Sequence, residues 1–289
     1  MWPHRAVAPE EAASWRRSSL ASAEYVAAVD RVDAGSAVAA ILTQHPHVCL
    51  TLITVLPELR RRGAGGALYE AVSVWAREHG VHLLETNTDT DDDASLTFAT
   101  RRGFTEHSRE AGLELDVGRF AGDAPAPPGV EIVSLRERPD LAEGTWAVAA
   151  ESIPDVPGGE DWTPPPRERW VEDFLLSPAS PPESLFVAVA DGEVVGYAKL
   201  RLAPDRRSAT HGMTAVKRAA RGRGIATALK HAQIAWAKEN GVERLRATNE
   251  ERNAPIRRVS ERLGYRPAAG RVILRGPLAS ASPSARRGA

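Results

Sequence analysis

Two segments of the chain combine arginine and glycine in a spacing that suits the binding of a phosphate group. Residues 60–65 read Arg-Arg-Arg-Gly-Ala-Gly, and residues 221–226 read Arg-Gly-Arg-Gly-Ile-Ala. Each segment follows a strand-like apolar run and precedes an amphipathic helical run, so several backbone N–H groups and a helix N-terminus should converge there. A glycine in such a turn lets a phosphate approach the backbone closely. The residues predicted to hold the phosphate are Arg221, Gly222, Arg223, Gly224, Ile225 and Ala226, with Arg60, Arg62, Gly63 and Gly65 in the first segment.

Other phosphate-binding motifs fit these segments less well. A Walker loop ends in Gly-Lys-Ser or Gly-Lys-Thr, which neither segment contains. The dinucleotide fingerprint requires a further glycine at the positions where this chain has Leu68 and Thr227. The segments therefore indicate a different class of phosphate ligand.

The two segments belong to an internal repeat. Arg60 precedes Arg221 by 161 positions (221 − 60), and each glycine of the repeat stands where a glycine has a structural task. The same offset relates Gly80 to Gly241, Gly103 to Gly264 and Phe104 to Tyr265. A period this long predicts a duplicated domain and not a solenoid.

The elements expected around the loops are those of an α/β (α+β) fold, a mixed β-sheet flanked by helices, present twice. In the second copy, apolar positions spaced by 3, 4, 7 and 11 predict a helix after the loop that ends at Asn240-Gly241. Strands are predicted at residues 131–134, 184–190, 194–202, 210–216, 242–248 and 271–275, and other helices at 143–151, 167–176 and 254–263. The first copy is predicted to contain strands at residues 25–30, 36–43 and 49–55, preceded by one helix at residues 12–23.

Composition shifts predict where the domains begin and end. Residues 121–129 are rich in Ala, Pro and Gly and have no periodicity, which is typical of a linker. We therefore expect a degenerate or accessory domain over residues 1–120 and the main domain over residues 130–278. The Ser-, Pro- and Arg-containing residues 279–289 are expected to form a disordered tail.

Charge and cysteine content disfavour several classes of function. The net charge of -1 offers no global attraction to nucleic acid or to an anionic membrane. Cys49 is the only cysteine, so no disulfide framework and no metal-binding cysteine pattern is expected, and we expect Cys49 to be a buried strand residue. With no long uninterrupted apolar run, the chain is expected to be a cytoplasmic monomer or homodimer without a membrane partner.

A longer stretch around the second loop carries a family resemblance. Residues 216–230 (Val-Lys-Arg-Ala-Ala-Arg-Gly-Arg-Gly-Ile-Ala-Thr-Ala-Leu-Lys) and residues 248–265, ending in Leu-Gly-Tyr, are similar to the GNAT superfamily of N-acetyltransferases. The resemblance covers residues 130–278 well and residues 20–118 less well. It implies a sheet that splays open after the strand ending at Val216, with acetyl-CoA as co-substrate in the gap and its pyrophosphate on the loop amides. It also implies direct attack of an amine on the thioester, without a covalent enzyme intermediate.

The resemblance implies roles for individual residues. A backbone N–H near Val216 is the expected donor to the acyl oxygen. Asn249 and Asn253 match polar positions beside the CoA arm, and Asn253 is also suited to cap a helix. Many family members have a tyrosine acid where this chain has Ser260, and the first copy has Ala99 there.

The attacking amine must lose a proton, which calls for a base. His211 lies on the strand leading into the loop, where the family often has its base, although a histidine that only packs is the alternative. Four carboxylates in the segment expected to cover the acceptor could bind a cationic amine, or form a solvated acidic loop: Glu151, Asp155, Glu160 and Asp161.

The sequence therefore predicts an acyl-CoA-dependent N-acetyltransferase that acts on a small-molecule amine. The active site is expected in the second copy, because the carboxylates of Asp91–Asp93 in the first copy would repel an anionic cofactor. A non-catalytic acyl-CoA-binding sensor or interaction protein remains the alternative. A nucleic-acid module is disfavoured by the neutral net charge.

Overall fold

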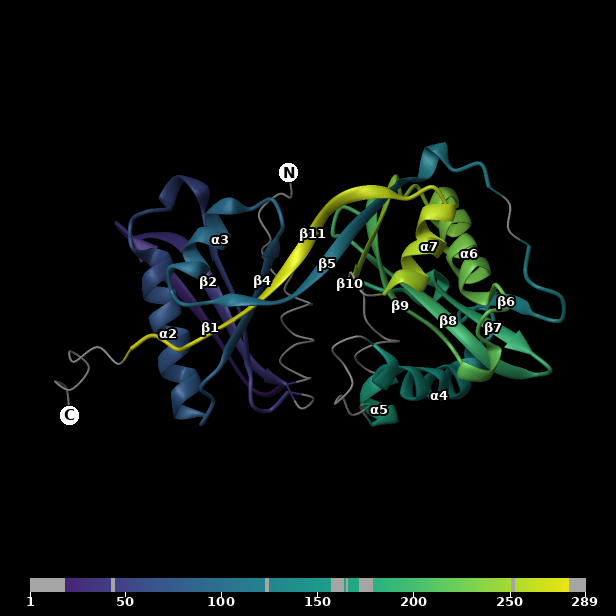
Figure 1. The fold of residues 1–289 in the computed structure, drawn as a ribbon, viewed down its shortest axis with the longest axis horizontal. Coiled ribbons are helices and arrows are strands. Elements are labelled where there is room, and N and C mark those ends of the chain that lie inside the picture. The colour runs from purple at the N-terminus through teal and green to yellow at the C-terminus, as the bar shows by residue number, and fades with distance from the viewer. Residues whose placement is uncertain are drawn as a thin grey trace. The chain divides into compact units, whose positions relative to one another are not determined.

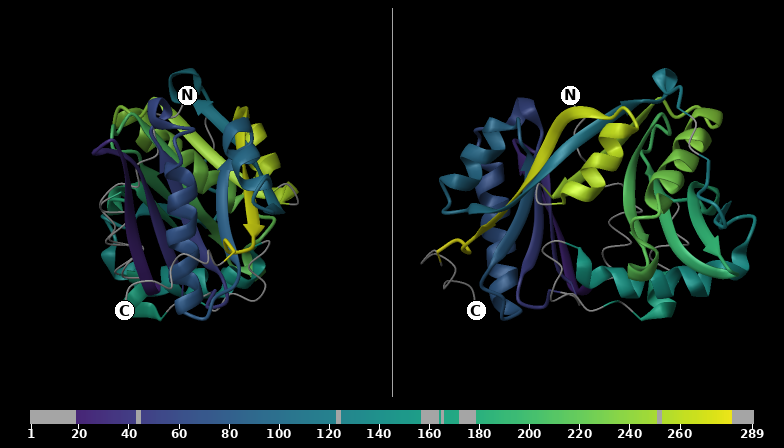
Figure 2. Two further views of the ribbon diagram at one scale, coloured as in Figure 1. Left: turned by 90° about the vertical axis from the view of Figure 1, so that its left-hand side faces the viewer. Right: turned by 45° about the vertical axis from the view of Figure 1, so that its right-hand side comes forward.

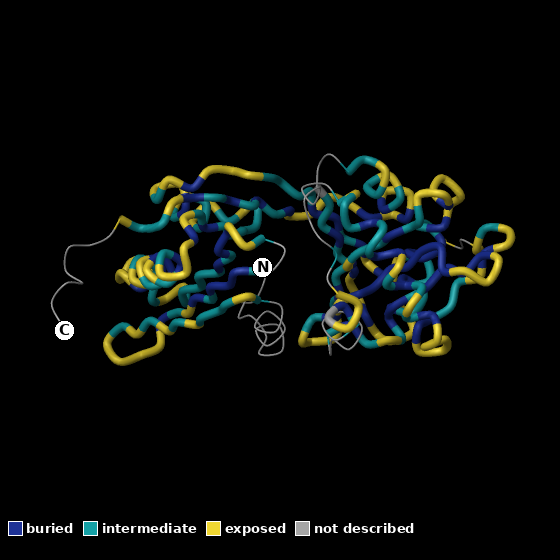
Figure 3. Tube along the Cα trace, turned by 90° about the horizontal axis from the view of Figure 1, so that it is seen from below, coloured by how far each residue is buried: buried dark blue, intermediate teal, exposed yellow. Residues whose placement is uncertain are grey.

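The computed structural model describes residues 19–42, 45–122, 125–156, 164, 166–171, 179–250 and 253–280. The chain forms two compact units. Unit 1 consists of Met1–Ser108 with Val272–Ala289, and unit 2 consists of Arg109–Arg271. Exposed residues concentrate in the turns of each unit, and buried residues lie in its strands and on one face of its helices (Figure 3).

Unit 1 is a mixed sheet that shares one core with two helices. Strands β1, β2 and β3 are antiparallel neighbours, and β3 pairs with β4 in the parallel sense. Next to β4 lies β11, followed by β5, and this unit contains residues 272–276 and 105–108 of those two strands. The bounds are β1 Ser19–Val29, β2 Val32–Leu42, β3 Cys49–Val55, β4 Leu84–Asp89, β5 Thr105–Asp116 and β11 Arg266–Gly276, with helices α2 Ala64–Glu78 and α3 Asp93–Thr100.

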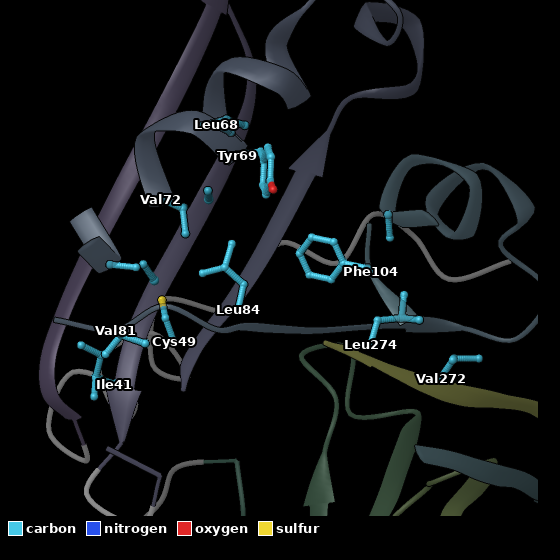
Figure 4. Packing of buried hydrophobic residues seen from close by; sticks show 14 residues of the cluster. Ile41, Cys49, Leu68, Tyr69, Val72, Val81, Leu84, Phe104, Val272 and Leu274 are labelled. Carbon is cyan, nitrogen blue, oxygen red and sulfur yellow. The ribbon is translucent and has the colours of Figure 1, made fainter. Parts of the chain in front are cut away.

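The core of unit 1 follows from the periodicity of its elements. Leu68 and Val72 recur four residues apart on α2 and are fully buried. They pack against Cys49 of β3 and Leu84 of β4, whose side chains point into the same cluster (Figure 4). The prediction that Cys49 is a buried strand residue is confirmed, and burial raises the pKa of its thiol to about 12.

Unit 2 has the same plan with more elements. Its strands follow the order β11-β5-β10-β9-β8-β7-β6 (Figure 1). The strands are β6 Glu131–Ser134, β7 Leu185–Ala190, β8 Glu193–Leu202, β9 Ser208–Val216 and β10 Arg244–Glu250. The helices are α4 Ala142–Ser152, α5 Arg167–Trp170, α6 Ile225–Glu239 and α7 Ala254–Arg262. Single 3-10 turns are found in both units, at Pro57–Leu59, Val117–Arg119, Pro139–Leu141, Ile153–Asp155, Pro182–Ser184 and Arg218–Ala220.

Helices cover both faces of the sheet in unit 2 (Figures 1 and 2). On one side, which we call the α6 face, Leu200 and Leu245 pack with Ile234 of α6. On the other side, the α4 face, Tyr197 and Ala215 pack with residues of α4 and α5. Because strand side chains alternate between faces, each strand residue can be assigned to one of these two environments.

In both units the two strands flanking the loop separate soon after they meet. In unit 2, β9 and β10 pair only through residues 208–210 and 244–246. In unit 1, β3 and β4 pair only through residues 49–50 and 84–85. The predicted splayed sheet of each copy is therefore confirmed.

A β-bulge interrupts β9 before the loop. Ala198 of β8 pairs with Thr214, whereas Leu200 pairs with His211, so β9 has one more residue than β8 in this interval. The extra residue reverses the alternation of side chains. Ala209 therefore packs on the α6 face and Ala215 on the α4 face, although the two positions have the same parity.

The N-terminal prediction is partly wrong. Residues 19–23, expected at the end of a helix, belong to β1, which pairs with β2 from Ser19 opposite Leu42. Residues 12–18 of that helix lie outside the described residues. In the predicted helix 167–176, Arg167–Trp170 is helical and residues 172–176 lie outside the described part.

The boundaries between the units differ from the expected ones. They fall inside strands β5 and β11, and residues 125–129 of the expected linker belong to unit 2. The C-terminal segment joins unit 1, because Val272 and Leu274 enter its apolar core (Figure 4). Beyond β11, Pro277 O accepts a hydrogen bond from the Tyr69 hydroxyl at 2.9 Å, and Ala279 N donates to Ser73 Oγ at 2.9 Å. Ala279, expected to begin a disordered tail, is thus held on α2, while residues 281–289 lie outside the described residues.

Candidate active site

The second arginine–glycine loop has a backbone suited to an anion. Gly224 is the N-cap residue of α6 with φ +85°, and no side chain caps the helix. The first amides of α6, beginning at Ile225 and Ala226, therefore have no partner within the helix. A Cβ on Gly222, where φ is +77°, would meet no atom within 4 Å, and one on Gly224 would come no closer than 3.7 Å, to Pro127. The N-terminus of α6 is therefore uncapped, and the space beside Gly222 and Gly224 is open.

The first loop repeats this geometry in unit 1. Gly63 caps α2 with φ +92°, again without a side-chain cap. Arg60 Nε donates to Val55 O at 3.1 Å, and Arg221 Nε makes the equivalent bond to Val216 O at 3.0 Å. The leading arginine of each motif thus shapes its turn by binding the last carbonyl of the preceding strand.

The third arginine of each motif distinguishes the two copies. In unit 1, Arg62 forms an ion pair with Asp30. In unit 2, the equivalent residues are Arg223 and Asp191 (62 + 161 and 30 + 161), and they form no ion pair in the described part of the chain. Both line the same shallow concavity beside the loop. The guanidinium of Arg223 therefore remains available at the rim, whereas that of Arg62 is neutralised.

Side chains also cover the first loop. The Phe98 ring lies 3.1 Å from the position of a Cβ on Gly65, next to Val55 at the end of β3. The Arg102 guanidinium stacks on that ring at 3.5 Å. The corresponding positions of unit 2 hold Val259 and Leu263 (98 + 161 and 102 + 161). Val259 is smaller than Phe98, and Leu263 is uncharged and shorter than Arg102. The first copy therefore offers less room beside its loop.

The acidic cluster of the first copy has a local role. Asp92 is the N-cap residue of α3, and its carboxylate accepts hydrogen bonds from Ser95 N at 3.0 Å and Ser95 Oγ at 2.7 Å. This is the usual capping arrangement. In unit 2 the N-cap residue of α7 is Asn253, whose side chain makes no capping bond.

Two of the four carboxylates expected near the acceptor are bound to the loop region. Asp155 accepts from Arg218 at 2.6 and 3.0 Å and from Arg221 at 2.5 Å, and these bonds lower its pKa to about 2. Glu151 accepts from the backbone N–H of Arg218 at 2.7 Å. These two residues fasten the end of α4 to the segment before α6, so the solvated-loop alternative does not apply to them. Glu160 and Asp161 lie outside the described residues.

His211 is buried in a polar chain on the α6 face. Its Nδ1 lies 2.8 Å from Gln233 Oε1, and its Nε2 is hydrogen-bonded to the Tyr265 hydroxyl. Since an amide oxygen only accepts, Nδ1 carries the proton and Nε2 accepts from Tyr265. Burial, and then the nearby Lys230, lower the pKa of His211 well below 6.5, against a smaller opposite effect of the bond to Gln233. With both ring nitrogens engaged, the geometry favours the packing role of His211 over the role of base.

Several buried polar atoms of unit 2 have no hydrogen-bond partner among the described residues. They come from four different elements: Thr214 Oγ1 of β9, Gln233 Nε2 of α6, Asn249 Nδ2 of β10 and Ser260 Oγ of α7. Buried polar groups are nearly always satisfied in folded proteins, so each of these atoms calls for an explanation. Ser260 is fully buried, and the Ser260 hydroxyl is a far weaker acid than a tyrosine.

Sequence reasoning missed two buried lysines. Lys230 of α6 is 1% exposed, and Lys199 of β8 is 7% exposed. Burial lowers the pKa of each to about 7. The apolar spacing predicted for this helix ran from Ile225 to Trp236, but the buried face of α6 also includes Gln233 and Ala237 with Lys230. A lysine beside Leu229 on an otherwise apolar helix face was the available signal.

The described residues contain no group of three or more His, Cys, Asp and Glu side chains arranged to hold a metal ion. None of their helices is both long and apolar enough to cross a membrane.

The splayed sheets with their glycine-bearing loops define a class of acyl-transferring α+β proteins. The model of the acetyltransferase (GNAT) family matches residues 2–104 and 147–265. The chain belongs to the GNAT family, is an acetyltransferase, and contains two domains of that fold.

Curated relatives and solved structures agree with this assignment. The chain is 27% identical over 234 residues to a mycothiol acetyltransferase of Thermomonospora curvata. The matched region covers 78% of this chain and 73% of that protein. The chain is 27% identical over 231 residues to the mycothiol acetyltransferase of Acidothermus cellulolyticus, covering 74% and 67%. A tandem GNAT protein from the clavulanic acid biosynthesis pathway has the same fold, with a TM-score of 0.71 and 22% identity over 91% of this chain and 86% of that one.

Proposed function

We propose that this protein transfers an acetyl group from acetyl-CoA to the amine of a small molecule, using the site in unit 2. The observation that carries the proposal is the uncapped N-terminus of α6, which follows Gly224 in the loop after β9, the strand that splays away from β10. A helix end with unpaired amides and a nearby Arg223 suits the pyrophosphate of a CoA thioester. The mycothiol acetyltransferase relatives support a small-molecule acceptor.

The residues present fit acetyl-CoA in unit 2. The amides of residues 221–226 would hold the pyrophosphate, with Arg223 at the rim. The unsatisfied atoms of Thr214, Asn249 and Ser260 come from elements that border the splay and would supply polar contacts to the amide-containing CoA arm. When bound, acetyl-CoA supplies the acyl group as a thioester.

This chain's own residues would then assist the transfer in simple ways. Backbone N–H groups of β9 near Val216 would donate to the acyl oxygen, where negative charge develops. A departing thiol has a pKa of about 8.5, so it needs little help from an acid, and the absence of a tyrosine at Ser260 is tolerable. An amine of ordinary pKa, about 10.4, is mostly protonated at neutral pH and has to lose that proton before attack.

One observation keeps a second function in view. Ser260 stands where many family members have their acid, and its hydroxyl is fully buried. A non-catalytic acyl-CoA-binding sensor would need no acid and no base. Such a protein would bind acetyl-CoA without releasing CoA.

Two measurements on the full chain separate these functions. Isothermal titration with acetyl-CoA reports binding, and a thiol reagent reports CoA release in the presence of an amine panel. We expect saturable binding together with amine-dependent release. Binding without release for every amine would favour the sensor, and the absence of binding would contradict both.

A further inference from the structure

Four residues connect the end of α4 to the segment that leads into the second loop. Glu151 accepts a hydrogen bond from the backbone N–H of Arg218 at 2.7 Å. Asp155 accepts from the Arg218 guanidinium through both carboxylate oxygens, at 2.6 and 3.0 Å, and from Arg221 Nη2 at 2.5 Å. We call these four residues the clamp. Its contacts join residues 63 to 67 positions apart in the chain, so local sequence does not impose them.

The clamp extends to the end of β9. Arg221 Nε donates to Val216 O at 3.0 Å, while Nη2 of the same guanidinium donates to Asp155. A guanidinium group is rigid and planar, so two bonds from one group fix the positions of both acceptors relative to each other. The side chain of Arg221 thereby connects Asp155, in the turn after α4, with Val216, near which the acyl oxygen is proposed to lie.

The first copy forms the same turn without a clamp. The 3-10 turn Arg218–Ala220 corresponds to Pro57–Leu59 of unit 1 (218 − 161 = 57), and in both units the leading arginine of the motif binds the last carbonyl of its strand. Pro57 has neither a backbone N–H nor a charged side chain, so it cannot make either of the contacts that Arg218 makes. The turn therefore does not require the clamp, which is found in the unit proposed to be active.

The clamp lies on the side of β9 that remains for the acceptor. Ala149 of α4 belongs to the same buried cluster as Ala215 of β9, so α4 covers this strand up to the residue before Val216. The opposite side of β9 is filled by His211 and its two buried hydrogen-bond partners. An amine that reaches a thioester near Val216 therefore has to approach past the end of α4.

Asp155 is suited to act through its partners. Its carboxylate accepts three hydrogen bonds from two guanidinium groups. These bonds lower its pKa to about 2, so the carboxylate stays ionised and is a weak base at neutral pH. Holding an ammonium group or taking a proton from it would compete with bonds that the carboxylate already makes.

We propose that Asp155 is a positioning residue, which holds the end of α4 against the acetyl-CoA loop and so places the acceptor amine beside the thioester. Glu151 and Arg218 act with it as parts of the clamp. The proposal rests on the proposed acetyl transfer and assigns the side of β9 from which the acceptor approaches. It places the effect of Asp155 on the acceptor, because the loop amides and Arg223 do not depend on the clamp.

The substitution Asp155→Asn tests the proposal by separating the two substrates. Glucosamine, tyramine and spermidine serve as acceptor probes with acetyl-CoA saturating, and calorimetric titration without acceptor gives the Kd of acetyl-CoA. An amide is neutral and has one acceptor oxygen, so it holds the two arginines less well. For the probe that the wild type acetylates best, we expect KM to rise by about tenfold or more, with the acetyl-CoA Kd changed by less than about threefold. A general folding defect would weaken both.

Further variants locate the effect in the clamp. Asp155→Glu keeps the charge and should restore part of the acceptor KM. Arg218→Gln should raise that KM as Asp155→Asn does, and the double variant should be no worse than the weaker single variant, because both remove one contact. Asp140→Asn is the matched control, since Asp140 binds the Arg138 guanidinium through both oxygens, at 2.7 and 2.9 Å, outside the clamp. Its acceptor KM should stay within about twofold of the wild type.

The outcomes are separable from those of the proposed function. An acceptor KM of Asp155→Asn within about twofold of the wild type, or an equal loss of acetyl-CoA affinity, overturns the proposal while leaving acetyl transfer intact. A deficit that shrinks as pH approaches the pKa of the amine also overturns it, because that result identifies Asp155 as the base. Melting curves show which variants are folded, and Asp155→Glu with Arg218→Gln provides the comparison if Asp155→Asn is not. Wild-type protein that binds acetyl-CoA but acetylates none of the probes contradicts the proposed function, and the proposal with it.

Discussion

His211, Gln233 and Tyr265 link three elements of unit 2 by side-chain hydrogen bonds. His211 comes from β9, Gln233 from α6, and Tyr265 from the turn between α7 and β11. These hydrogen bonds therefore connect β9, on one side of the splay, to the segment that follows β10 and α7. From these bonds we infer that His211 is a positioning residue, whose contribution to activity would come through the geometry of the splay.

The substitution His211→Ala separates this role from that of a base. It leaves Gln233 and Tyr265 without a buried partner, so we expect a loss of about 2–4 kcal/mol in the free energy of unfolding. The kcat/KM should fall by the same factor at every pH. Melting curves and a pH–rate profile measure the two effects. A deficit that shrinks as pH approaches the pKa of the acceptor amine would instead identify His211 as the base.

Lys230 makes the stability of the protein depend on pH. The folded state lowers its pKa from 10.5 to about 7 by burial, so between these values the unfolded chain binds a proton that the folded chain does not. Stability therefore rises with pH from about 7 to about 10.5. Lys230→Met should remove the contribution of Lys230 to that slope, while the contribution of Lys199, whose pKa is also lowered to about 7, remains. The same substitution should raise the unfolding free energy at about pH 7 by on the order of 1–4 kcal/mol.

Denaturant unfolding at about pH 7 and about pH 9.5 measures both effects of Lys230→Met. Lys238→Met is the control, since Lys238 is exposed in the last turn of the same helix. An unchanged pH slope in Lys230→Met would mean that Lys230 is charged inside the fold.

At the scale of elements, the close approach of β5 and β11 depends on glycine. A Cβ on Gly112 of β5 would overlap the backbone carbonyl of Ala269 in β11, and one on Gly270 would overlap the carbonyl of Glu110. The two strands can approach this closely only because both positions lack a side chain. Gly112 and Gly270 thereby permit the pairing on one edge of the unit 2 sheet.

The substitution Gly112→Ala should therefore be costly. Backbone atoms have to move to admit the methyl group, so we expect a loss of about 2–4 kcal/mol of unfolding free energy, at the upper end of overpacking effects. Gly118→Ala is the control, because its Cβ would meet only the end of the Asp116 side chain at 3.3 Å. Equal melting temperatures of the two variants would contradict this account of the strand pair.

At the scale of the whole molecule, two copies of one fold differ in what surrounds the same loop. In unit 1 the rim arginine Arg62 is paired with Asp30, and Phe98 with Arg102 crowds the loop. In unit 2 the equivalent Arg223 forms no ion pair among the described residues. Duplication has therefore kept the loop backbone in both copies while its surroundings have diverged.

We expect one acetyl-CoA to bind per chain, at the second loop. Gly224→Glu should weaken acetyl-CoA binding at least 100-fold by bringing a carboxylate to the helix N-terminus, and Gly63→Glu should leave it within about twofold. Gly224→Ala and Gly63→Ala control for strain, because both glycines have positive φ. Calorimetric stoichiometry provides the test. Two sites per chain, or a loss of binding confined to Gly63→Glu, would contradict the assignment of the acetyl-CoA site to unit 2.

The sequence by itself determined the features that depend on local pattern. Helix α6 follows from its apolar spacing and from Gly224 and Gly241, both of which have positive φ. Strand β3 was predicted with its observed bounds, Cys49–Val55, because it is a short β-rich run before a turn. The repeat at a fixed offset predicted two domains of one fold, and the loop motif predicted the family.

Only the tertiary structure decided the partners of individual side chains and strands. No local pattern shows that Val272 and Leu274 complete the core of unit 1, that Asp155 binds Arg218 and Arg221, or that His211 meets Tyr265. These contacts join residues distant in the chain, so strand pairing and packing select them from many partners of similar local suitability. The bulge in β9 likewise reverses which side chains face α4, which periodicity alone assigns to the wrong side.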